Sequence, residues 1–145
     1  MKPELIKRLN EFLAQNPTLK GKPASEEEIK NAESKLGVKI HDDYKEFIQL
    51  FGGAYAGLAI HAFSNGSSIG NETVIELTTR SRDLFNKNNV FPESNQCYVI
   101  ADDGSGNPIA ISANEEILLF DYDTEEKKVL SESFEKLIED NFSEW

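Results

Sequence analysis

Residues 96–122 of the chain read QCYVIADDGSGNPIAISANEEILLFDY. Three largely apolar runs, at 96–100, 109–112 and 117–122, are separated by residues that favour turns. The first separator contains DDGSGN at 102–107, and Asp, Gly and Asn are the residues that tight turns require. Short strands at this spacing, joined by tight turns, predict a three-stranded antiparallel meander.

Helices are predicted on both sides of these strands along the chain. Ser25 stands three residues before Glu28, and Thr73 stands three residues before Glu76, which is the spacing of a capping box at a helix start. Apolar residues recur at helical spacing after both positions. With the other periodic segments, this pattern predicts helices at 3–15, 25–36, 42–51, 73–87 and 131–142.

The segment between the third and fourth helices predicts little regular structure. Gly57-Leu58-Ala59-Ile60 can start a strand, whereas residues 64–72 hold three Ser, two Gly and two Asn and predict a loop. Helices bunched at the two ends around antiparallel strands indicate an α+β fold. We therefore predict a single domain over residues 1–145, with an antiparallel or mixed sheet flanked by N-terminal, middle and C-terminal helices.

Length and composition restrict the class of protein. A chain of 145 residues with 39% hydrophobic and 28% charged residues is typical of one globular domain. No apolar run approaches the roughly 18 residues that span a membrane, and the N-terminus lacks the apolar stretch of a signal peptide. The single cysteine excludes an internal disulfide framework. We expect a cytoplasmic protein with no cofactor and no bound metal.

The negative charge is concentrated in the last third of the chain. The net charge is −11, and residues 101–145 contain 13 acidic and 3 basic side chains. Such a field repels phosphate backbones and anionic lipids, which argues against nucleic-acid and membrane partners. It attracts a basic protein. A surface that only keeps the protein soluble would have the same composition.

Catalytic motifs are weak in this sequence. Gly66-Ser67-Ser68-Ile69-Gly70 matches the G-x-S-x-G elbow of hydrolases, but no histidine follows residue 61 to complete a triad. Cys97 lies in an apolar strand pattern, where a free cysteine is usually a packing residue. His41 and His61 have no metal-ligand spacing, and we expect them to flank the third helix and to end a strand. We do not predict an enzyme.

Four aspartates follow the predicted strands and can converge at one edge of the sheet. They are Asp102, Asp103, Asp121 and Asp123. Three interpretations remain open for them: turn formation with an acidic surface, a cation site and a partner-binding patch. The segment from Asp102 to Gly106 lacks the alternating ligands of an EF-hand loop.

Four segments, taken in order, resemble motifs of the SUKH superfamily, the Smi/Knr cell-wall-regulator type of domain. They are Pro23–Ile29 with Glu33 and Leu36-Gly37, then Asp43–Ile48 with Gly52-Gly53, then Ile100–Gly106, and finally Ser131–Phe134. The resemblance covers about residues 20–140. It implies an α+β domain that binds another protein, and it supplies no catalytic residues.

The resemblance also implies two alternative functions. Bacterial members of the superfamily are mostly immunity proteins that bind and block a cognate toxin, often a nuclease, whereas eukaryotic relatives act as interaction scaffolds. A nuclease face that holds phosphates is basic, so an acidic inhibitor can cover it and associate rapidly. We therefore predict an immunity protein, with a cytosolic scaffold or regulator as the alternative. The predicted contact residues are Asp102, Asp103, Asp121 and Asp123, with Tyr122 or Tyr55 as an aromatic anchor.

Overall fold

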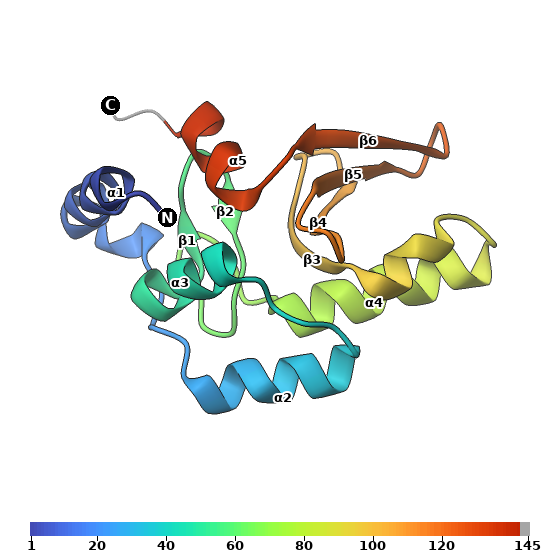
Figure 1. Ribbon diagram of the computed structural model, residues 1–145, viewed down its shortest axis with the longest axis horizontal. Coiled ribbons are helices and arrows are strands. Elements are labelled where there is room, and N and C mark those ends of the chain that lie inside the picture. The colour runs from blue at the N-terminus through green and yellow to red at the C-terminus, as the bar shows by residue number, and fades with distance from the viewer. Residues whose placement is uncertain (143–145) are drawn as a thin grey trace.

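A four-stranded antiparallel sheet and the helices around it make up the fold in a computed structural model, which describes residues 1–142 (Figure 1). The helices are α1 (Pro3–Gln15), α2 (Glu26–Leu36), α3 (Asp42–Phe51), α4 (Val74–Lys87) and α5 (Phe134–Asn141), with short 3₁₀ helices η1 (Pro17–Leu19) and η2 (Pro92–Gln96). The strands are β1 (Ala54–Tyr55), β2 (Ala59–Ile60), β3 (Tyr98–Asp102), β4 (Pro108–Ile111), β5 (Ile117–Asp121) and β6 (Glu126–Ser131). This arrangement confirms the predicted α+β class.

Both predicted capping boxes are present. Ser25 Oγ accepts from the N–H of Glu28 and the Glu28 carboxylate accepts from the N–H of Ser25, at the start of α2. Thr73 and Glu76 make the same reciprocal pair at the start of α4. Each pair satisfies two main-chain donors that a helix start leaves without partners. These local hydrogen bonds explain why the sequence predicts both helix starts correctly.

The sheet has a fourth strand that the sequence analysis misses. Strand β6 pairs along β5 from Asp121–Glu126 to Ile117–Ser131, and the register shifts where β6 has one residue more than β5. Every residue of β6 except Ser131 is exposed, so the strand has no alternation of apolar and polar residues. The C-terminal helix consequently starts at Phe134 rather than at the predicted residue 131.

The sheet separates two apolar clusters, because successive side chains of a strand point to opposite faces. On one face, Tyr98, Ile109 and Ile117 join a large cluster with α1, α3, α5 and the β1–β2 hairpin. On the other face, Val99, Ala110, Leu118 and Phe120 pack against Leu77 and Phe85 of α4 and against Phe91. Helix α4 therefore covers one face of the sheet, whereas α1, α3 and α5 lie toward the opposite face (Figure 1).

The outer edge of β3 is closed by hydrogen bonds from outside the sheet. The N–H of Val99 donates to Thr78 Oγ1 of α4 over 2.8 Å. The carbonyl of Ile100 accepts from the N–H of His61 over 2.8 Å. An open strand edge would expose these main-chain groups to other chains. Thr78 is fully buried, so its hydroxyl is the specific partner of the Val99 N–H.

Three chain segments meet at Gly52-Gly53, directly after α3. The carbonyl of Ser64 accepts from the N–H groups of both Lys22 and Gly53, and the N–H of Gly66 donates to the carbonyl of Gly53. A Cβ on Gly21 would overlap the carbonyl oxygen of Ser64 and lie 2.8 Å from that of Gly53. The glycines are required here because the main chains of these segments lie in direct contact.

Replacing Gly21 with Ala tests this close approach. The added Cβ meets main-chain oxygens that are held by hydrogen bonds, so we expect a loss of about 3 kcal/mol or more in the free energy of unfolding. Gly37→Ala is the control, because its Cβ meets nothing within 4 Å and carries only the strain of a φ of 65°, roughly 1–2 kcal/mol. A loss for Gly21→Ala no larger than that for Gly37→Ala in urea denaturation would contradict this prediction.

Replacing Thr78 with Val tests the closed edge of β3. The variant keeps the shape of the side chain but leaves the buried N–H of Val99 without a partner, so we expect it to lose about 1–3 kcal/mol of stability. Thr79→Val is a matched control on the exposed face of α4 and should change stability by less than about 0.5 kcal/mol. Thermal or chemical denaturation measures both; similar effects for the two variants would refute the assignment.

Candidate functional site

The β3–β4 and β5–β6 turns lie at the same end of the sheet and carry five of the six predicted contact residues. They are Asp102 and Asp103 beside the first turn and Asp121, Tyr122 and Asp123 beside the second. The N–H of Tyr122 donates to Asn107 Oδ1 over 3.2 Å, which joins the two turns. The structure therefore places these residues on one continuous surface.

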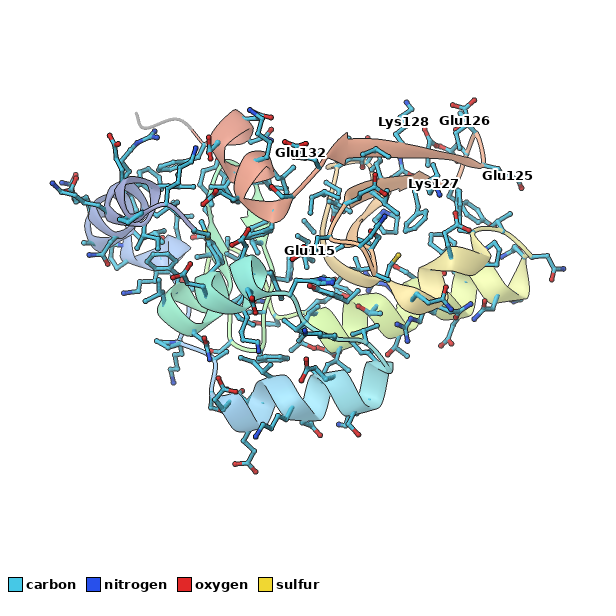
Figure 2. All side chains as sticks on the ribbon, viewed as in Figure 1. Glu115, Glu125, Glu126, Lys127, Lys128 and Glu132 are labelled. Atoms are coloured by element: carbon cyan, nitrogen blue, oxygen red, sulfur yellow. The ribbon has the colours of Figure 1, made fainter. Side chains whose placement is uncertain are left out.

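Two further carboxylates extend this surface. Figure 2 shows Glu125 and Glu126 at the tip of the β5–β6 hairpin, whereas Glu115 lies at the opposite end of the sheet. The sequence analysis missed Glu125 and Glu126 because it did not predict β6. We call the combined set the acidic turn surface; its members are Asp102, Asp103, Asp121, Asp123, Glu125 and Glu126.

Most of these aspartates also hold their own turns. Asp102 Oδ1 accepts from the N–H of Gly104 over 2.7 Å, and Asp121 Oδ1 accepts from the N–H groups of Asp123 and Thr124. Such contacts from an aspartate to the next residues are typical of tight turns. Asp123 differs, since no described residue donates a hydrogen bond to its carboxylate.

Asp103 makes the largest number of these contacts. Its carboxylate accepts from Asn107 Nδ2 over 3.0 Å and from the N–H groups of Ser105 and Asn107. The hydrogen bond from the Asn107 amide is the main reason that the pKa of Asp103 lies below its usual value. Asp103 is therefore an ionised carboxylate that organises the first turn.

A cavity of about 470 Å³ lies between α4 and the two turns, and we call it the α4 groove. Its apolar wall includes Leu77 and Leu84 of α4 together with Tyr122. Asp102 and Asp123 are also among its lining residues. The ring of Tyr122 is stacked on that of Phe85 at 6.2 Å, which fixes its plane. The groove is thus half apolar and bordered by negative charge.

Helix α4 supplies groove residues that the sequence analysis did not select. Leu84 is 44% exposed and lines the groove. Arg80 also lines the groove, and its guanidinium is paired with Glu72. No periodic signal in the sequence distinguishes these residues from an ordinary solvent-facing helix surface.

Arg82 of α4 points inward and fixes the helix. Its guanidinium donates to the carbonyls of Leu36, Ser94 and Cys97 over 2.8, 3.2 and 2.9 Å. Partial burial lowers the pKa of Arg82, although an arginine keeps its charge at neutral pH. The sequence analysis did not identify this role, because it depends on carbonyls at the end of α2 and in the segment from η2 to β3.

The sixth predicted contact residue, Tyr55, lies in a different part of the molecule. It is in β1, and its ring centroid is 6.2 Å from that of Phe12 in α1. Figure 1 shows β1 and α1 on the far side of the sheet from the tip of the β5–β6 hairpin. The α4 groove is therefore lined by Tyr122 and not by Tyr55.

Ser68 and Cys97, which lie in the weak catalytic motifs of the sequence, each donate a hydrogen bond to a main-chain carbonyl. Ser68 is exposed in the loop before α4, where its N–H donates to the carbonyl of Thr18, and it does not lie on a strand–turn–helix elbow. Cys97 is buried, and its thiol donates to the carbonyl of Glu93 over 3.3 Å. Burial raises the pKa of Cys97 to about 11, so the thiol stays protonated and weakly nucleophilic at neutral pH.

Both histidines contact main-chain carbonyls. His41 occupies the N-cap position of α3, with Nε2 3.1 Å from the carbonyl of Ala113 and Nδ1 2.9 Å from the hydroxyl of Tyr98. His61 follows β2, with Nδ1 2.6 Å from the carbonyl of Glu72. Within residues 1–142, no group of three or more His, Cys, Asp or Glu side chains is arranged to hold a metal ion.

No helix in the described part of the chain combines the length and apolar character needed to cross a membrane.

Comparison with known proteins places the chain in a family. No curated protein matches the sequence. The model of the SMI1 / KNR4 family (SUKH-1) matches residues 23–140, which run from just before α2 almost to the end of α5 and include both acidic turns. The match covers most of the chain, and the chain therefore belongs to the SMI1 / KNR4 family (SUKH-1).

Proposed function

We propose that this protein is an immunity protein that binds a toxin domain inside the cell and blocks it by covering its active face. The observation that carries the proposal is the acidic turn surface beside the α4 groove. Membership in the SMI1 / KNR4 family fits both an immunity protein and a regulator of the cell-wall type. The concentrated negative surface favours the first, because it matches a basic partner such as a nuclease.

Electrostatic attraction supports this function in two ways. A nuclease presents positive charge where it holds phosphates, and an acidic surface brought over that face excludes the substrate. The long-range field also accelerates encounter, by about 10- to 1000-fold for strongly complementary surfaces at low salt. Fast association suits an inhibitor that must capture a toxin before it acts.

The proposed mechanism uses binding and requires no reaction at the site. The turn aspartates supply charge, Tyr122 supplies an aromatic contact, and Leu84 supplies exposed apolar area next to the charge. Aromatic residues in a pocket bordered by polar groups are typical of the contacts that dominate interface affinity. The proposal therefore takes Tyr122, rather than Tyr55, as the anchor.

A charge variant with an intact turn tests the proposal. Asp102→Asn keeps an acceptor for the N–H of Gly104, and Asp123→Lys reverses a carboxylate to which no described residue donates. The binding partner in this test is the toxin encoded by the neighbouring gene. We expect the double variant to associate with it about tenfold more slowly than the unchanged protein does at low salt. We also expect it to lose protection of cells that express the toxin.

The matched control is Glu11→Lys with Glu27→Gln, which changes the net charge equally at exposed positions of α1 and α2. It should protect cells as the unchanged protein does. Equal association rates for the two double variants would remove the acidic turn surface from the interface. Failure of the unchanged protein to protect against any such toxin would favour the scaffold or regulator alternative.

A further inference from the structure

We propose that the α4 groove receives an arginine side chain of the partner protein. This inference rests on the proposed function for the source of the arginine, but it concerns the chemistry of the groove itself. It commits to one type of occupant, which is a cationic side chain with a flat head and an aliphatic stem. Three features of the groove support it.

The first feature is the apolar wall. Leu77 and Leu84 line the groove along α4, and Leu84 is nearly half exposed. The aliphatic stem of an arginine can lie along such a wall and remove its apolar surface from water. A small inorganic cation would leave this wall exposed, so the wall favours an organic occupant.

The second feature is the aromatic ring of Tyr122. Its stacking on Phe85 fixes the plane of the ring at the groove. A guanidinium stacks on aromatic rings and is more weakly hydrated than the ammonium of lysine. The ring therefore favours arginine over lysine.

The third feature is charge. Asp102 and Asp123 border the groove, and a guanidinium can donate to carboxylates through paired N–H groups. Arg80 is the opposing charge in the lining, and its pairing with Glu72 reduces its repulsion of a second cation. The groove and the surrounding acidic turn surface together remain negative.

The two turns are also held in place before anything binds. Asn107 accepts from the N–H of Tyr122 through its amide oxygen and donates to Asp103 through its amide nitrogen. One side chain thereby connects the turn that carries Asp102 to the turn that carries Asp123. A preformed site avoids most of the entropy cost of ordering loops on binding.

The experiment is a titration of the ¹⁵N-labelled full chain with N-acetyl-arginine amide, followed by amide chemical shifts. The matched probe is N-acetyl-citrulline amide, which has a similar shape and no charge. We expect saturable shifts for the arginine probe at the amides of residues 104–107, 122–124 and 81–85. We expect the citrulline probe to bind at least about tenfold more weakly, because it cannot make charge-assisted hydrogen bonds.

Three variants make the assignment specific. Asp102→Asn with Asp123→Asn should weaken binding of the arginine probe about tenfold. Arg80→Gln should strengthen it, because the one opposing charge in the lining is removed. Glu11→Gln with Glu27→Gln removes two exposed carboxylates elsewhere and should leave the affinity unchanged. Unchanged amide spectra away from the substitutions show that each variant is folded.

The outcomes separate this inference from the proposed function, since the titration contains no toxin. Equal binding of the two probes overturns the inference. It is also overturned if the arginine probe shifts the amides of α1 and α2 as much as those of the groove. Protection from the toxin without saturable arginine binding also overturns it and leaves the proposed function standing. Specific arginine binding without protection from any toxin supports the groove chemistry and overturns the immunity function.

Discussion

The geometry of the site depends on the contact between the Arg82 guanidinium and three main-chain carbonyls. These carbonyls belong to the end of α2, to η2 and to the residue before β3. One charged side chain of α4 therefore fixes that helix to the sheet and to α2. Carbonyl dipoles supply the polar partners that a half-buried cation needs. Because α4 forms one wall of the groove and the turns form the other, this contact helps to set the width of the groove.

In the proposed function, the turn aspartates serve both structure and recognition. Asp103 and Asp121 each accept at least two main-chain N–H groups, so their carboxylates are committed to the shape of the turns. No described residue donates a hydrogen bond to the carboxylate of Asp123. In the proposed complex the partner is therefore bound at the groove by Asp123 and by Asp102, which accepts only one main-chain N–H, that of Gly104. Asp103 and Asp121 add to the field at longer range.

Local signals explain what the sequence predicts well and what it does not. The starts of α2 and α4 are encoded within four residues by Ser25 with Glu28 and by Thr73 with Glu76, and a local hydrogen bond needs no tertiary context. The β3–β5 meander is similarly encoded by apolar runs and turn residues. Strand β6 has neither signal, because it is a charged and exposed edge. The groove joins residues 77–85 of α4 to turn residues between 102 and 123, so no local pattern contains it.

The position of β6 also bears on how a partner can approach. Figure 2 shows Glu126, Lys127 and Lys128 along this edge strand, and the register shift lies near its other end. Charged side chains, lysine above all, and bulges are the features by which edge strands resist pairing with other chains. Addition of a partner strand at β6 is therefore disfavoured, although Val129 and Leu130 are exposed there. Recognition through side chains at the end of the sheet, beside α4, avoids this obstacle and uses a surface whose turns are already ordered.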